Sequence, residues 1–187
     1  MPPETEAGPA VGAAGSNAQK MRVLVVGVGN ILLKDEGIGV HVARKLQELA
    51  LPNDVEVIDA GTAGLDILLL HEDVERLIVI DAVKAGNKAG TIYKALLLAG
   101  EMEKLTQLFD RRSDSKISLH QIGLIEAMAA AEKLNCAPKE IVIIGVEPGR
   151  WDWGLELTCP VARSVPEVVK KVLEEAENVI HREQADR

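Results

Sequence analysis

Short runs of β-branched residues alternate along the chain with stretches whose apolar residues recur at helical spacing. The pattern predicts five strands, the fourth of them short, near residues 22–28, 55–60, 76–83, 90–96 and 140–148. Helices are expected over residues 38–49, 65–70, 101–109 and 120–134. Strands that alternate with helices form a parallel sheet covered on both faces. The sequence therefore predicts an α/β fold with three layers, α/β/α.

A last helix is predicted to begin at Ser164, because the Ser-x-x-Glu spacing to Glu167 fits a capping box and Pro166 is tolerated in a first turn. The loop before this helix contains both tryptophans of the chain, Trp151 and Trp153. These rings either belong to a protein-binding surface or pack as lids, and the sequence leaves both interpretations open.

Composition and charge narrow the class of protein. With 187 residues the chain suffices for one domain, expected over 21–187, after a disordered extension over 1–20 that does not resemble a secretory signal. Apolar runs are far shorter than the ~20 residues of a membrane helix, and the formal net charge of −8 disfavours nucleic acid as a partner. The two cysteines, Cys136 and Cys159, form no close pair. A soluble, cytoplasmic protein with reduced thiols is expected.

The segment "VGVGNILLKDEGIG", residues 26–39, begins like a nucleotide-binding turn. A dinucleotide fingerprint requires a third glycine where Leu32 stands, and the carboxylates of Asp35 and Glu36 at a helix start would repel a pyrophosphate. Asp59, at the end of the second strand, nevertheless imitates the acid that binds a ribose. A Rossmann-like dinucleotide-binding protein therefore stays open as an alternative.

The two acids of this segment are expected to differ in role. Asp35 is expected to cap the helix start. If the strands follow the usual 2-1-3 order, Glu36 and Asp81 converge at the carboxyl ends of the first and third strands, where two carboxylates repel each other unless a proton or cation lies between them. His120, at a loop-to-helix junction, is a candidate third ligand. Such an oxygen and nitrogen donor set suits nickel or zinc and leaves coordination positions open, as in catalytic sites.

Five motifs, in this order and spacing, resemble those of the hydrogenase maturation proteases: "GVGNILLKDEGIGV", "DAGTAGLDIL", "IVIDAV", "KISLHQIGL" and "GLELT". The resemblance extends from Arg22 to about Leu173. It implies a twisted five-stranded sheet between helices, with one antiparallel strand. It also implies that Glu36, Asp81 and His120 bind the metal.

The same resemblance implies an endopeptidase that removes the carboxyl-terminal extension from the nickel-loaded precursor of a [NiFe]-hydrogenase large subunit. The Ni²⁺ is then supplied by that precursor, and a monomer is expected. Asp59 and Thr62 are expected to border the cleft, or else to serve as a strand-end acid and a helix cap. Gly37 and Gly39 are expected to keep the helix start slim enough for a protein substrate to approach. A non-catalytic nickel-binding chaperone is a further alternative.

Overall fold

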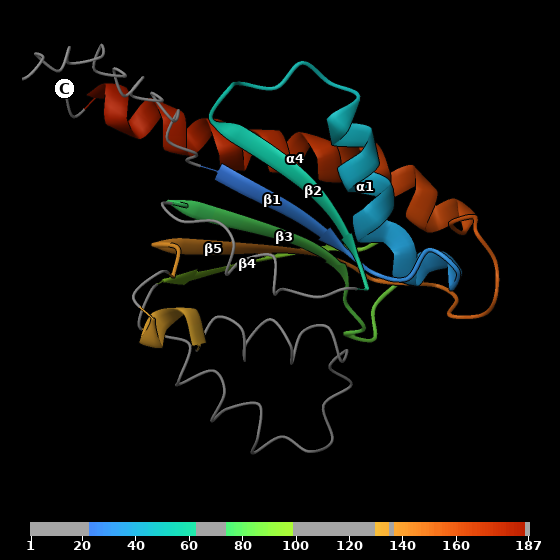
Figure 1. Ribbon diagram of the computed structural model, residues 1–187. Coiled ribbons are helices and arrows are strands. Elements are labelled where there is room, and N and C mark those ends of the chain that lie inside the picture. Colours follow the sequence, from blue (N-terminus) through green and yellow to red (C-terminus); the bar gives the residue numbers. More distant parts are fainter. Residues whose placement is uncertain (1–22, 63–73, 99–129, 135–136, 186–187) are drawn as a thin grey trace, which may run out of the picture.

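The computed structural model describes residues 23–62, 74–98, 130–134 and 137–185. Within them, five strands form one sheet in the order β2-β1-β3-β5-β4 (Figure 1). The strands are β1 (Val23–Val28), β2 (Val55–Gly61), β3 (Arg76–Ala82), β4 (Ile92–Leu98) and β5 (Glu140–Val146). All neighbours pair in parallel except β4, which lies antiparallel to β5 at the edge. The predicted 2-1-3 order and the single antiparallel strand are both confirmed.

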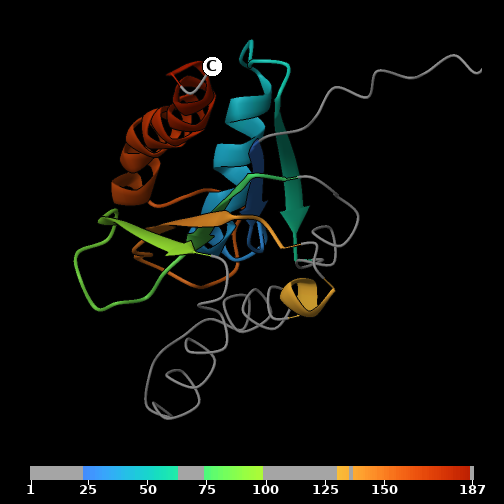
Figure 2. The same ribbon diagram turned by 90° about the vertical axis from the view of Figure 1, so that its left-hand side faces the viewer.

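Helices cover both faces of this sheet. The short 3₁₀ helix η1 (Lys34–Gly37) leads into α1 (Ile38–Gln47), and α4 (Cys159–Ala185) follows β5. Figure 2 shows α1 and α4 on one side of the sheet and the helical turn at 130–133 on the other. Val25 and Ile78 pack toward α1 and α4, whereas Leu24 and Leu77 pack in a second cluster with Ala131. The three-layer prediction is therefore confirmed.

The central strands are buried along their whole length, as expected for parallel strands covered on both faces. Every residue of β1 and β3 is buried, while β2 and β4, at the two edges of the sheet, are mostly half-buried or exposed. A side chain carried by β1 or β3 can therefore reach a substrate only where these strands end.

The prediction that the last helix begins at Ser164 is wrong, because α4 begins at Cys159. The Ser164 hydroxyl donates to the carbonyl of Val161, and Pro166 lies inside the helix rather than in its first turn. The first turn closes earlier, where the N–H of Ala162 donates to the carbonyl of the preceding loop residue Thr158 at 2.8 Å. The capping-box spacing was thus a coincidence inside a longer helix.

A network of charged side chains centres on the buried Arg76, at the amino end of β3. Arg76, 2 % exposed at the start of β3, donates to the carboxylate of Glu140 on β5 and to both the carbonyl and the carboxylate of Glu175 on α4. Lys94 of β4 also pairs with Glu175. This network ties three strands and α4 together, with Arg76 and Glu140 at the amino ends of β3 and β5 and Lys94 further along, in register with Ile144.

Several sequence-based expectations fall outside the described residues. They are the extension over 1–20, the helices over 65–70 and 101–109, and residues 120–129 of the helix expected to begin at His120. From 130 to 133 that predicted helix is described and is helical. No helix among the described residues is long and apolar enough to span a membrane.

Candidate active site

The turn after β1 carries the acidic segment over the carboxyl ends of the central strands. Gly29 has a φ of +138°, and a Cβ there would lie 1.9 Å from the carbonyl oxygen of Glu36. At Gly39 a Cβ would lie 2.2 Å from the carbonyl oxygens of both Val28 and Ile80. Only glycine lets the backbones approach this closely. The first turn of α1 therefore rests directly on the ends of β1 and β3, and η1 packs against β3.

The expected purpose of two of these glycines is corrected by the same contacts. At Gly37 a Cβ would lie 2.8 Å from the Cα of Ile31, and at Gly39 it would meet the backbone of the two strands. The space beside both glycines is filled by the chain's own backbone, so they serve internal close packing and not the approach of a substrate.

Glu36 differs from Asp35 in having a carboxylate oxygen that nothing among the described residues hydrogen-bonds. Its side chain is half-buried, and its Oε2 is buried with no hydrogen-bond partner among the described residues. A desolvated carboxylate oxygen without a donor is unfavourable in isolation. It is a suitable ligand for a divalent cation brought to the site.

Asp81 lies at the carboxyl end of the central strand β3, one residue before the strand ends. It is 2 % exposed, and its Oδ1 accepts a hydrogen bond from the N–H of Ala82 at 2.7 Å. Asp81 therefore lies in the strand next to β1, and Glu36 lies in the 3₁₀ helix of the turn that follows β1. That the two carboxylates converge stays a prediction. His120 lies outside the described residues, and within the part of the chain that is described no three acidic, histidine or cysteine side chains gather as a metal site. The three-ligand set stays a prediction.

Asp35 does not cap a helix, contrary to expectation. Neither η1 nor α1 has a side-chain cap, and Asp35 is fully buried. Its carboxylate accepts hydrogen bonds from the N–H groups of Gly149, Arg150 and Thr158 at 2.8, 2.9 and 2.7 Å, and from the Thr158 hydroxyl at 2.8 Å. Asp35 therefore fastens the loop between β5 and α4 to the turn that carries Glu36.

A second buried acid organises the loop that follows Asp81. Glu147, just after β5, accepts hydrogen bonds from the N–H groups of Ala85 and Gly86 and from the hydroxyl of Tyr93. Burial raises the pKa of Glu147, but these hydrogen bonds outweigh it and the net pKa lies below the ordinary value. The pKa of Tyr93 is raised, by burial and by its bond to Glu147. Glu147 thus acts as an ionised anchor for residues 85 and 86.

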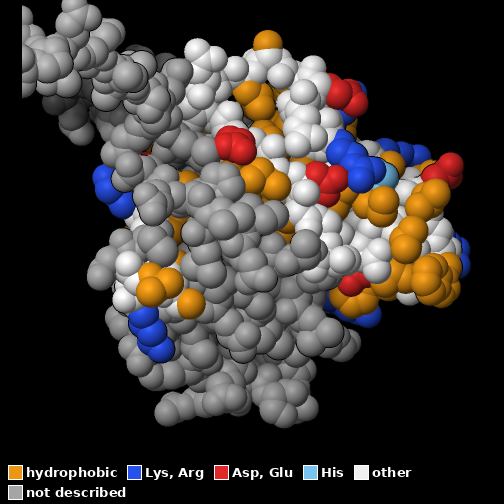
Figure 3. All heavy atoms as spheres, viewed as in Figure 1, with side chains coloured by type: hydrophobic (Ala, Val, Ile, Leu, Met, Phe, Trp, Pro, Cys, Tyr) orange, Lys and Arg blue, Asp and Glu red, His pale blue; other side chains and the backbone are white. Residues whose placement is uncertain are grey.

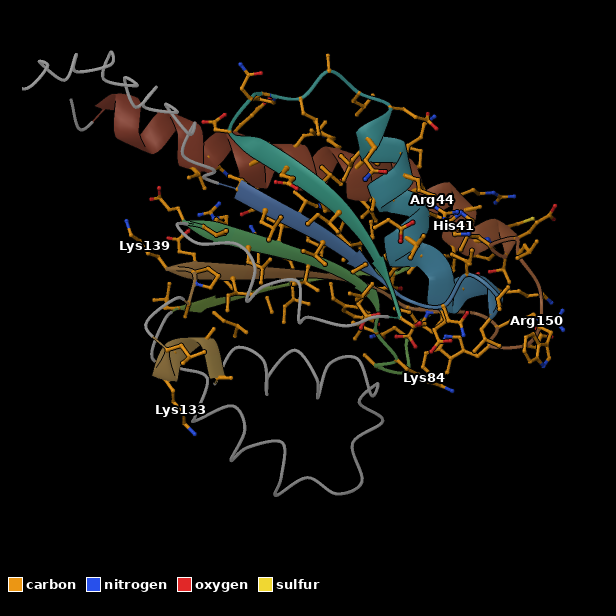
Figure 4. The ribbon with its side chains drawn as sticks, viewed as in Figure 1. His41, Arg44, Lys84, Lys133, Lys139 and Arg150 are labelled. Carbon is orange, nitrogen blue, oxygen red and sulfur yellow. The ribbon has the colours of Figure 1, made fainter. Side chains whose placement is uncertain are left out.

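A cavity of about 290 Å³ opens beside this edge, between the turn after β1, α1 and the end of β2. Asp59 and Thr62 line it together with Arg44 of α1, whereas Glu36 and Asp81 do not. That Asp59 and Thr62 border the catalytic cleft stays a prediction. The Arg44 Nε donates to Asp59 Oδ2 at 2.8 Å, and the N–H of Gly61 donates to Asp59 Oδ1 at 3.1 Å. Figure 4 labels Arg44 on α1, next to His41. Asp59 is therefore held in place at the wall of the cavity.

A family model described as hydrogenase maturation protease matches residues 40–175. The chain is 38 % identical over 148 residues to the hydrogenase expression/formation protein HupD of Bradyrhizobium diazoefficiens, covering 78 % of this chain and 73 % of the relative. It is 37 % identical to the hydrogenase 2 maturation protease of Escherichia coli, covering 82 % and 89 %. The chain belongs to the hydrogenase maturation protease family.

Comparison with solved structures supports the same family assignment. The maturating endopeptidase HybD of Escherichia coli superposes with a TM-score of 0.72 at 34 % identity, over 84 % of this chain and 93 % of that one. The [NiFe] hydrogenase maturation protease HybD of Thermococcus kodakarensis gives 0.64 at 28 %, over 83 % and 99 %. The chain is accordingly a protease, and its glycine turn belongs to this fold rather than to a dinucleotide-binding protein.

Sequence reasoning missed two features of this maturation protease. His41 of α1 belongs to none of the candidate sets drawn from the sequence, yet its Nε2 is buried without a hydrogen-bond partner among the described residues. The role of Asp35 was also missed, because its donors lie 114 to 123 positions further along the chain. No pattern of neighbouring residues in the sequence predicts hydrogen-bond partners at such a separation.

Proposed function

We propose that this protease removes the carboxyl-terminal extension from the nickel-loaded precursor of a [NiFe]-hydrogenase large subunit. Glu36, Asp81 and His120 complete the coordination of the nickel that the precursor carries, and the protease thereby distinguishes loaded from empty precursor. The observation that carries the proposal is the buried Oε2 of Glu36, which has no hydrogen-bond partner among the described residues, in the turn after β1, the strand next to that of Asp81. The chain's membership of the hydrogenase maturation protease family supports it.

The donor chemistry fits this role. Two carboxylates and an imidazole suit a borderline divalent ion and leave positions for the ligands that the precursor itself supplies. A bound nickel can polarise a peptide carbonyl or lower the pKa of a bound water to about 7. Coordination from both proteins places the scissile bond, because the metal holds the reacting groups in a fixed orientation.

The direct test is incubation of the protease with nickel-loaded and nickel-free precursor, followed on a gel. Loaded precursor should be shortened and nickel-free precursor should not. Glu36→Gln and His120→Ala should stop the shortening, whereas Glu48→Gln, an exposed acid at the end of α1, should process normally. Normal processing by both site variants would overturn the proposal.

The same experiment separates the protease from a non-catalytic nickel chaperone. A chaperone would take nickel from the precursor and leave its length unchanged. Mass spectrometry of the precursor and measurement of protein-bound nickel, in the same samples, distinguish the two functions. Shortening with nickel retained by the large subunit is the expected result.

A further inference from the structure

The loop between β5 and α4 presents an exposed apolar surface next to the candidate site. Trp153 is 79 % exposed, Leu155 61 % and Trp151 41 %, and Leu32 in the turn after β1 is 47 % exposed. These four side chains are called the tryptophan patch below. Figure 3 shows hydrophobic side chains gathered at the end of the molecule where Figure 4 places Arg150. The two rings are therefore not packed as lids.

The patch is held in a fixed shape. The N–H of Lys34 donates to the carbonyl of Gly154 at 2.8 Å, and the N–H of Gly154 donates to the carbonyl of Leu32 at 3.0 Å. Lys34 also pairs with Asp152 at 2.8 Å, and Asp35 accepts the hydrogen bonds from both ends of the loop. A surface that is ordered before binding loses little conformational entropy when a partner docks.

The charges around the patch differ from those of the whole chain. Lys84 lies over the ring of Trp151, with its Nζ 5.3 Å from the ring centroid. Among the described residues, Lys34 and Arg150 both pair with Asp152, and the exposed Glu156 is the other acid of this loop beside the patch. Three cations, Lys34, Lys84 and Arg150, therefore face two acids here, although the chain carries a net charge of −8. Cations that border an aromatic surface favour a partner with apolar groups flanked by carboxylates. A second copy of this chain, docked through the same patch, would bring like cations together.

We propose that the tryptophan patch is a docking site for the folded body of the precursor, away from the scissile peptide, and that it binds an apolar surface bordered by acidic residues. This inference rests on the proposed function. The patch and Glu36 are parts of one hydrogen-bonded unit, since Asp35 and Glu36 are adjacent and Asp35 holds the loop. Docking at the patch therefore sets the position of the precursor relative to the candidate ligands.

The test compares the double variant Trp153→Ser/Leu155→Ser with Leu134→Ser, which removes a 66 % exposed leucine elsewhere. The double variant should raise the KM for nickel-loaded precursor by about tenfold, typical of the loss of aromatic anchors, with kcat unchanged. Leu134→Ser should change neither constant. Lys84→Glu should also raise KM. An unchanged KM in the double variant overturns the docking proposal while the protease function stands.

A binding measurement separates docking from cleavage. Both tryptophans lie in this loop, so 5-fluorotryptophan labelling gives two fluorine resonances, each reporting on the patch. Both resonances should shift or broaden when precursor is added, and should stay unchanged with serum albumin. Shifted resonances without cleavage support docking and refute the proposed function. Unshifted resonances, or a dimer in sedimentation that the double variant dissociates, overturn the docking proposal.

Discussion

The carboxylate of Asp35 accepts two hydrogen bonds from Thr158, one from its N–H at 2.7 Å and one from its hydroxyl at 2.8 Å. This contact joins the turn after β1 to the residue that immediately precedes α4. It fixes both the tryptophan patch and the start of the last helix. Several measurable consequences follow from the different environments of Asp35 and its neighbour Glu36.

Replacement of Asp35 by alanine should lower the free energy of unfolding by about 3 kcal/mol, because three N–H groups and a hydroxyl lose a charged acceptor. Thr158→Val, which removes only the hydroxyl bond, should cost about 1 kcal/mol. Urea denaturation measures both. An Asp35→Ala protein as stable as the wild type would contradict the role of this carboxylate.

Glu36→Gln, unlike Asp35→Ala, should impair activity and leave the stability of the protein nearly unchanged. Because Oε2 has no hydrogen-bond donor among the described residues, the free energy of unfolding should change by no more than about 0.5 kcal/mol. Processing of the precursor should nevertheless fall by at least ~100-fold, as for a group that acts on the reacting site. Urea denaturation measures the change in stability, and a cleavage time course on the same preparation measures the loss of processing. A large loss of stability would indicate a structural role instead.

Tyr93→Phe should produce a pH-dependent loss of stability. The pKa of Glu147 in the folded protein is lowered from 4.5, so its ionised form adds stability above that pH, and this contribution is lost as the pH falls through the folded-state value. Removal of the Tyr93 hydroxyl should cost about 1 kcal/mol at pH 7. The difference from the wild type should narrow below pH 4.5.

Thr91→Val provides the matched control for this pH series, since it removes a hydroxyl bond to the carbonyl of Lys88 in the same segment. Its cost should not vary between pH 7 and pH 4, because neither partner titrates in this range. Urea denaturation at several pH values gives both curves. Parallel curves for the two variants would contradict the prediction for Glu147.

Gly39→Ala should be among the most damaging small substitutions. The added Cβ would meet two carbonyl oxygens at 2.2 Å, so α1 must shift away from the ends of β1 and β3. A cost of at least about 3 kcal/mol is expected. Gly86→Ala is the control: nothing lies within 4 Å of its Cβ, and only its φ of +90° opposes the change, for about 1 kcal/mol. Thermal unfolding ranks the two.

Much of the fold could be predicted from the sequence, because apolar runs and turn residues act locally. The strand order at the centre of the sheet, with β1 next to β3, followed from general rules of α/β topology. The antiparallel β4 did not follow from periodicity, which contains no strand direction; it came from the family resemblance. The topology thus places Glu36 and Asp81 next to neighbouring central strands, while the third predicted ligand, His120, lies outside the described residues.

The two errors near the site have one cause. A helix cap for Asp35 and a helix start at Ser164 were both inferred from local spacing. In the structure a long-range contact overrides both, because Asp35 bonds to Thr158 and α4 begins with the next residue. Local motifs describe what a residue is able to do, whereas the partner it finds depends on which segments the sheet brings together.

The network around Arg76 has a consequence for how this protease can vary. It lies at the first residue of β3, and Asp81 lies five residues further along the same strand, about 17 Å away. Substitutions separated by more than about 10 Å usually act independently. Substitutions of Arg76 or of its partner Glu140 should therefore leave the environment of Asp81 unchanged. Residues at the amino end of β3 can therefore change during evolution independently of the carboxyl end, where a change of substrate would select different residues.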